Sequence, residues 1–107
     1  MSDVLARIRI LIDRGEVEVS LHGFRELAAD NILLDDAIGG VGGAIVVEDY
    51  PSAQRGPSVL VLQRDRNDNP LHFLWGIPKD REAPAVLITA YRPDPNRWSA
   101  DFTRRTR

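Results

Sequence analysis

The first part of the chain has apolar residues at helical spacing. A helix is predicted up to about residue 14, and its apolar residues form one stripe: Val4, Leu5, Ile8, Leu11 and Ile12. Ser2 can cap its first turn, and Gly15 is typical of the position after a helix end. Val17 and Val19 then alternate with glutamates, which predicts a short bridging strand or an extended link.

Two shorter helices are predicted over residues 21–29 and 34–40. Ser20 can cap the first of them. Three of its residues are expected to face the core: Phe24, Leu27 and Ala28. The glycine-rich segment 39–43 ends the second helix and is interpreted as a hinge, because it lacks the Lys-Ser/Thr pair of a phosphate-binding loop.

The rest of the chain has the apolar runs and turn residues of β-structure. Four strands are predicted: 44–49, 58–64, 70–77 and 85–91. Short connections favour an antiparallel meander. The predicted fold class is therefore α+β, with two to three N-terminal helices packed on one face of a four-stranded antiparallel sheet and the other face open.

Length and composition limit what the protein can be. A chain of 107 residues with 43% hydrophobic content is expected to form one domain over residues 1–107. It contains no cysteine, which excludes disulfides, cysteine zinc sites, iron–sulfur clusters and thiol catalysis. No apolar run is long enough to cross a bilayer, so we expect a cytoplasmic protein with no membrane partner.

The charges are distributed unevenly around a net charge of −2. Residues 1–91 contain 9 Lys/Arg and 14 Asp/Glu, whereas residues 92–107 contain 5 Arg and 2 Asp. A basic tail on an acidic body suits contact with nucleic acid or with an acidic partner. A solvated chain end explains the same charges.

Strand alternation singles out one histidine. On strand 70–77, His72 is expected on the face opposite to Phe73 and Trp75. Four residues of strand 85–91 form one predicted row: Ala85, Leu87, Thr89 and Tyr91. His72 and Tyr91 converge if the two strands are neighbours in a suitable register. Histidine is the usual general acid or base near neutral pH, and a partly buried histidine bonded to backbone is the structural alternative.

Two other groups carry candidate chemistry. His22 and Arg25 lie at helical spacing and suit proton transfer and phosphate binding, or they belong to a solvated helix face. Prolines in the segment after residue 91 keep the chain stiff and extended as it leaves the strand. Arg92, Arg97 and Trp98 in this segment suit phosphate contact with base stacking. Trp98 packed on the core is the alternative. No metal site is predicted, because HxH and HExxH spacings are absent.

Several blocks of the chain together resemble a known family. They are His22-Gly-Phe-Arg25 with Ile32, Glu48-Asp-Tyr-Pro51, Pro57-Ser-Val-Leu-Val-Leu62, Pro70-Leu-His72, and Ile88-Thr-Ala-Tyr-Arg-Pro-Asp-Pro95 with Trp98. The chain is similar to a small bacterial family of unknown function that is grouped with RelE-like and BrnT-like toxins. Members of that family are often encoded beside zinc-finger antitoxins of the MqsA/YgiT type.

This resemblance implies a RelE/ParE-like toxin fold and a type II toxin. It implies a metal-independent endoribonuclease that needs no cofactor, cuts messenger RNA, on the ribosome or off it, and is neutralised by a cognate antitoxin. His72, His22 and Tyr91 are then the candidate proton-transfer groups. The candidate phosphate clamps are Arg25, Arg64, Arg92 and Arg97. A non-catalytic protein-binding module of the same fold is the alternative, and a metal-dependent small-molecule enzyme is a third.

Overall fold

The computed structural model describes residues 2–106 of the chain. Its helices are α1 (Asp3–Asp13), α2 (Leu21–Ala29), α3 (Leu34–Gly39) and a short 3-10 helix, η1 (Val41–Gly43). Its strands are β1 (Val17–Val19), β2 (Ile45–Tyr50), β3 (Ser58–Arg64), β4 (Pro70–Gly76) and β5 (Ala85–Tyr91). The predicted helices and strands are thus present, with boundaries close to those expected from the sequence.

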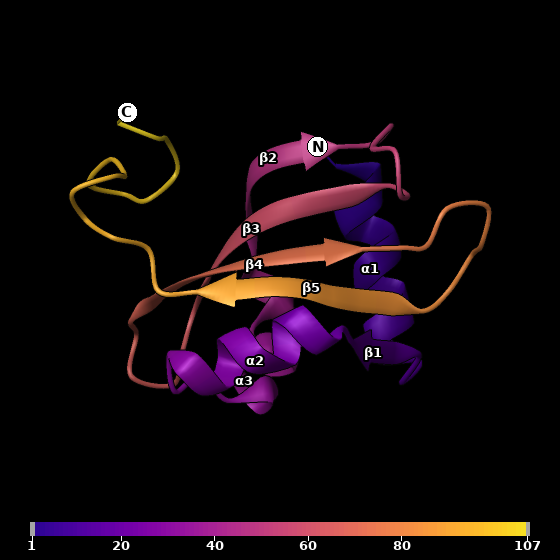
Figure 1. The fold of residues 1–107 in the computed structure, drawn as a ribbon, viewed down its shortest axis with the longest axis horizontal. Coiled ribbons are helices and arrows are strands. Elements are labelled where there is room, and N and C mark those ends of the chain that lie inside the picture. The colour runs from indigo at the N-terminus through magenta and orange to yellow at the C-terminus, as the bar shows by residue number, and fades with distance from the viewer. Residues whose placement is uncertain (1, 107) are drawn as a thin grey trace.

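The strands of the described residues form one sheet in the order β1-β5-β4-β3-β2 (Figure 1). Strands β2 to β5 form the predicted antiparallel meander. β1 pairs in parallel with β5, with Val17 opposite Ala85 and Val19 opposite Leu87. The expected four-stranded antiparallel sheet is therefore wrong, because this sheet has five strands and is mixed. Local turns predict hairpins, but they carry no information on a parallel pairing between distant segments.

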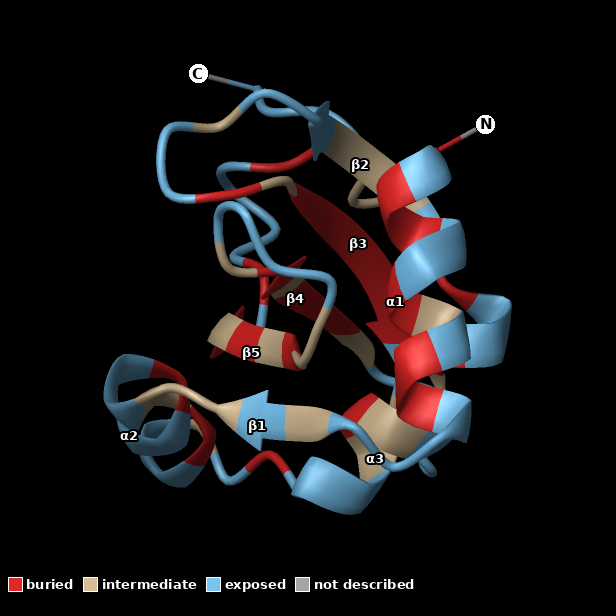
Figure 2. Cartoon of the chain, turned by 90° about the vertical axis from the view of Figure 1, so that its right-hand side faces the viewer, coloured by how far each residue is buried: buried red, intermediate tan, exposed pale blue. Residues whose placement is uncertain are grey.

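The core lies between α1 and one face of the sheet. The whole apolar stripe of α1 is buried there against central sheet residues that include Val61, Phe73 and Trp75. Figure 2 shows α1 as a band with its buried side toward the sheet and its exposed side outward. Trp75 is fully buried, and its indole N–H donates to Gln63, which in turn donates to the carbonyl of Ala37. We call this side of the sheet the core face.

α2 runs beside β5 and approaches it very closely. A Cβ on Gly23 would lie 2.5 Å from the carbonyl oxygen of Leu87, so only glycine fits this contact. The buried residues of α2 are Gly23 and Leu27, whereas Phe24 is 64% exposed and Ala28 is also exposed. The expectation that Phe24 and Ala28 face the core is therefore wrong, because the glycine contact sets the rotation of the helix.

A β-bulge in β5 changes the direction of its last side chains. Thr89 lies opposite Leu74, but Leu87 lies opposite Trp75, so Ile88 is an extra residue in the strand. Ala85 and Leu87 are buried on the core face, whereas Tyr91 lies opposite His72 on the other face. The predicted row of Ala85, Leu87, Thr89 and Tyr91 is therefore wrong beyond Leu87.

A second bulge has the same effect in β2. Val46 lies opposite Val61 on the core face, and Glu48 lies opposite Leu60, so Val47 is the extra residue. Without this shift, strict alternation would turn Glu48 toward the core, on the same side as Val46. With it, Glu48 and Tyr50 share the side of the sheet that carries His72. We call this side the His72 face.

The chain after β5 folds back over one end of the His72 face. Trp98 is buried and forms an isolated backbone bridge with Arg105. Asp101 organises the turn between them, because its carboxylate accepts from Ser99 and from Thr103, and these bonds lower its pKa to about 2. Residues 92–106 thus form a folded segment packed against the His72 face.

Candidate functional site

A hydrogen-bonded chain of three residues lies on the His72 face. His72 stands in the middle of β4 and is completely buried. Its Nδ1 is 3.0 Å from the hydroxyl of Tyr91, and its Nε2 is 2.8 Å from the backbone carbonyl oxygen of Phe102. His72 and Tyr91 thus converge, and the register, which the sequence analysis left open, places them directly opposite each other.

These partners define the protonation state of the histidine. A carbonyl oxygen only accepts, so Nε2 carries a hydrogen and donates to Phe102, which leaves Nδ1 to accept from the Tyr91 hydroxyl. Burial lowers the pKa of His72 below its usual 6.5, although the bond to Phe102 opposes this effect. Burial also raises the pKa of Tyr91. Near neutral pH the pair is therefore a neutral imidazole and a protonated phenol.

The tail encloses this pair. The ring of Trp98 meets the ring of His72 edge-on at 4.4 Å, and the guanidinium of Arg105 lies 5.0 Å above the Trp98 ring. Phe102, whose carbonyl accepts from His72, has a left-handed backbone with φ of 63°. This conformation is unfavourable for a bulky residue, so the contact with His72 holds a strained backbone in place.

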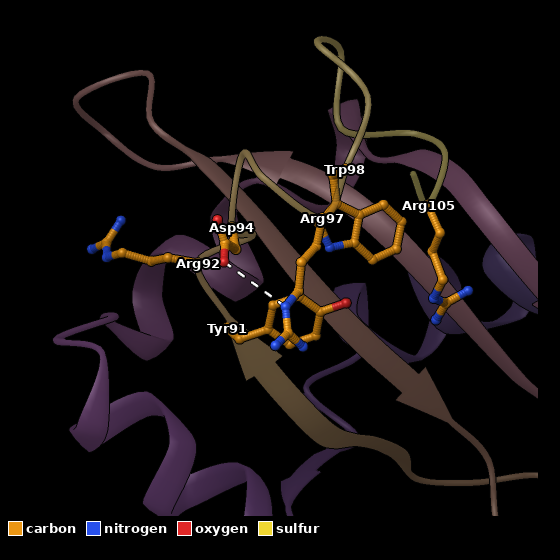
Figure 3. Close-up of a pocket in the computed structure, with 6 residues that line it drawn as sticks. All are labelled: Tyr91, Arg92, Asp94, Arg97, Trp98 and Arg105. Atoms are coloured by element: carbon orange, nitrogen blue, oxygen red, sulfur yellow. Dashed lines mark ion pairs between the residues drawn. The ribbon is translucent and has the colours of Figure 1, made fainter. Parts of the chain in front are cut away.

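A pocket of about 710 Å³ opens beside Tyr91. Its lining residues come from the end of β5 and from the tail: Tyr91, Arg92, Asp94, Arg97, Trp98 and Arg105. Figure 3 shows Trp98 between the side chains of Arg97 and Arg105, with the guanidinium of Arg92 directed away from them. The pocket thus combines a phenol, backed by a buried imidazole, with three arginines and one carboxylate.

Arg92 and Arg97, the two arginines that sequence analysis singled out after β5, differ in the contacts that they make. Arg92 donates to the carbonyls of Asp30 and Asn31 and to the carboxylate of Asp65, so its guanidinium joins α2, the β3–β4 loop and β5. Arg97 is 80% exposed and pairs only loosely with Asp94, at 3.9 Å. Arg97 is therefore available to an anion, whereas Arg92 acts as a structural support.

Comparison with known families shows to which family the chain belongs. A family model described as a domain of unknown function, DUF4258, matches residues 19–92. The chain belongs to the DUF4258 family. No curated protein and no solved structure gives a significant match.

The DUF4258 match contains part of the pocket. His72 and Tyr91 lie within the matched residues, and Trp98 and Arg105 lie after them. The hydrogen-bonded pair of His72 and Tyr91 therefore belongs to the family region of this DUF4258 protein, together with Arg92, whereas Arg97 and Arg105 come from the segment that follows.

A second polar group in the DUF4258 region reaches the same place. Glu48 accepts hydrogen bonds from the hydroxyl of Tyr50, at 2.6 Å, and from the guanidinium of Arg105. The bond from Arg105 is the largest of the effects that lower the pKa of Glu48. Glu48 and Tyr50 thereby join β2 to the pocket.

The other predicted site residues of the DUF4258 protein lie elsewhere. His22 and Arg25 are exposed on α2, and Arg64 is exposed at the end of β3, where it donates to the carbonyl of Asp68. Among residues 2–106, none of these three lines the pocket beside Tyr91. Their assignment to proton transfer or phosphate binding stays a prediction.

Sequence reasoning did not assign Arg105, Asp94 or Glu48 to the site. Arg105 was one of several tail arginines with no feature to separate it from Arg104. Glu48 was part of a block that carried the family resemblance, and an acidic residue inside an apolar strand is the signal that identifies it. Such a residue needs a bulge or a partner to avoid burial in the core.

Two further structural findings concern metals and membranes. No group of three or more histidine, aspartate or glutamate side chains within residues 2–106 is arranged to hold a metal ion. In the same part of the chain, no helix has the length and apolar character needed to cross a membrane.

Proposed function

We propose that the pocket binds single-stranded RNA and cleaves it without a metal ion. The observation that carries this proposal is the Tyr91 hydroxyl, which lines a pocket with Arg97 and donates to a buried neutral histidine 3.0 Å away. The bulge in β5 supports it, because bulges are common beside active sites, where they redirect a side chain.

The proposed reaction begins with proton removal from the ribose. The Tyr91 oxygen accepts the proton of a 2′-hydroxyl while it passes its own proton to Nδ1 of His72. The 2′-oxygen then bonds to phosphorus, the bond from phosphorus to the 5′-oxygen breaks, and the leaving oxygen takes a proton from water. The hydroxide that remains takes a proton from Tyr91, which recovers its own from Nδ1 of His72, so the pair returns to its starting state. The products are a 2′,3′-cyclic phosphate and a 5′-hydroxyl end.

Each residue has a distinct part in this reaction. Tyr91 is the catalytic residue, because it is the group that meets the substrate. His72 is a positioning residue and proton acceptor that acts through Tyr91, and its imidazolium form still donates to Phe102. Arg97 stabilises the negative charge that develops on the phosphorane oxygens.

The biological role that fits this reaction is that of a type II toxin. Its substrate is messenger RNA, which places its action in the cytoplasm, and a cognate antitoxin is its partner. The ring nitrogens of His72 are enclosed by Tyr91 and Phe102, so substrate reaches the pair only through the exposed edge of Tyr91.

A second candidate function is protein binding without catalysis. It is favoured by one observation, the exposed apolar row Leu21, Phe24 and Ala28 along α2. These residues have the i, i+3, i+7 spacing of a helix face that packs against a partner.

Growth measurements distinguish the two candidates. Expression of the wild-type protein is expected to slow growth and shorten the half-life of total messenger RNA. Tyr91→Phe and Arg97→Gln are expected to relieve both effects at unchanged protein levels, and the matched loop variant Arg81→Gln is expected to relieve neither. Growth arrest that persists in Tyr91→Phe but disappears in Phe24→Ser would favour protein binding instead.

A further inference from the structure

Arg105 is the second cation of the pocket, and a carboxylate of the same chain already engages it. Its guanidinium lies over Trp98 and donates to Glu48. Arg97 lies on the other side of Trp98 (Figure 3). The third lining arginine, Arg92, is held by Asp65. Arg97 and Arg105 are therefore two separate cationic positions, and of these two only Arg105 has a well-placed anion.

The position of Glu48 depends on two features of β2. The bulge at Val47 turns Glu48 onto the His72 face, and the hydroxyl of Tyr50 donates to the same Oε1 that accepts from Arg105. Glu48 is thus fixed where an anionic ligand of Arg105 would lie. A bulge and a tyrosine hydroxyl therefore position a contact that contributes nothing to the apolar core.

The contact between Glu48 and Arg105 is easily exchanged. Their side chains are 37% and 56% exposed, and exposed ion pairs contribute little to stability. A phosphate also offers arginine anionic oxygen acceptors, and two of its oxygens can accept from one guanidinium. A phosphate held nearby by other contacts can therefore replace the carboxylate at little cost.

We propose that Arg105 is a second phosphate subsite, occupied in the free protein by Glu48 and in the complex by the phosphate next to the one at Tyr91 and Arg97. This inference rests on the proposed RNA function and specifies its ligand. The ligand is a single strand with at least two consecutive phosphodiesters. A ligand with one phosphodiester takes the Tyr91 and Arg97 position and leaves Glu48 on Arg105.

The test uses two uncleavable ligands, a 2′-O-methyl dinucleotide with one phosphodiester and a trinucleotide with two. NMR titrations give the affinity of each for the wild type and for Glu48→Gln, Arg105→Gln and Asp49→Asn. Asp49→Asn is the matched control, because it removes one negative charge from the same strand while its side chain can still accept the hydrogen bond from Ser2.

Glu48→Gln is expected to raise the trinucleotide affinity about two- to fivefold, which matches the worth of an exposed ion pair, and to leave the dinucleotide affinity unchanged. Arg105→Gln is expected to reduce the trinucleotide affinity to that of the dinucleotide. Asp49→Asn is expected to change neither.

Three results would overturn the subsite: a lower or unchanged trinucleotide affinity in Glu48→Gln, an equal gain for both ligands, or the same gain in Asp49→Asn. Failure of RNA cleavage is a separate outcome. If the wild type does not cleave RNA but the affinities follow this pattern, the subsite stands and the cleavage proposal fails. If the wild type cleaves RNA and the affinities do not follow it, the subsite alone fails.

Discussion

At the scale of single residues, the burial and hydrogen bonds of His72 are the central feature of the site. It is fully buried, yet each ring nitrogen has one hydrogen-bond partner. Strand alternation predicts its face, and its approach to Tyr91 depends on the register and on the bulge at Ile88. It does not predict the burial, because the residues that enclose His72 are Trp98 and Phe102, which come from a tail far along the chain.

The bond between Tyr91 and His72 has a measurable effect on stability. Tyr91→Phe leaves the buried Nδ1 of His72 without a donor, which is expected to lower the free energy of unfolding by about 1–3 kcal/mol. Tyr50→Phe is the matched control. Its acceptor Glu48 lies at the surface, so this variant is expected to lose less than about 1 kcal/mol. Urea unfolding measures both, and equal losses would contradict the buried bond.

The lowered pKa of His72 makes stability depend on pH. Its folded pKa lies below the unfolded value of 6.5, so the unfolded chain binds more protons as the pH falls. The stabilising effect is complete above pH 6.5 and is expected to be lost as the pH falls from 6.5 through the folded pKa. Urea unfolding between pH 8 and pH 5 should show this loss in the wild type and a flatter profile in His72→Gln. Parallel profiles would indicate that His72 is not held neutral.

At the scale of elements, close packing and strand irregularity determine the geometry. α2 is positioned by the contact between Gly23 and the Leu87 carbonyl. Gly23→Ala should therefore destabilise the protein by about 1–3 kcal/mol through overpacking, although alanine is the better helix former. Gly39→Ala is the control, because a Cβ there meets nothing within 4 Å. Thermal unfolding of both variants tests this, and a stabilised Gly23→Ala would contradict the close contact.

The sequence predicts most elements but not the irregularities that build the site. The stripe of α1, the strands and their turns follow from periodicity and turn chemistry. The bulges at Val47 and Ile88 do not follow from the sequence, because the residues of each strand are equally compatible with regular alternation and with a bulge. Those two shifts move Glu48 and Tyr91 onto the His72 face. The parallel pairing of β1 with β5 does not follow from the sequence either, because it joins segments that are distant in the chain.

At the scale of the whole molecule, the tail carries a net positive charge on an otherwise acidic protein. Three of its arginines line the pocket, but Arg92 is held by Asp65, which leaves Arg97 and Arg105 as the expected phosphate contacts. Each phosphate neutralised on a single strand steepens the log–log salt dependence of binding by about 0.7, so two phosphates give an expected slope of about −1.4. Arg97→Gln and Arg105→Gln should each flatten the slope by about 0.7, and the neighbouring Arg104→Gln should not. Fluorescence anisotropy with an uncleavable 2′-O-methyl strand measures these slopes. Equal effects from all three variants would indicate a diffuse contact.

The most direct test of the account is cleavage of a defined single-stranded RNA in excess EDTA, with analysis of the product ends. The wild type is expected to produce 2′,3′-cyclic phosphate and 5′-hydroxyl ends. Tyr91→Phe, at a temperature where it remains folded, is expected to react about 10²–10⁴-fold more slowly, as is typical when one proton-transfer group is lost. No cleavage by the wild type, or equal rates for the two proteins, would contradict the assignment of Tyr91 and its buried histidine to RNA cleavage.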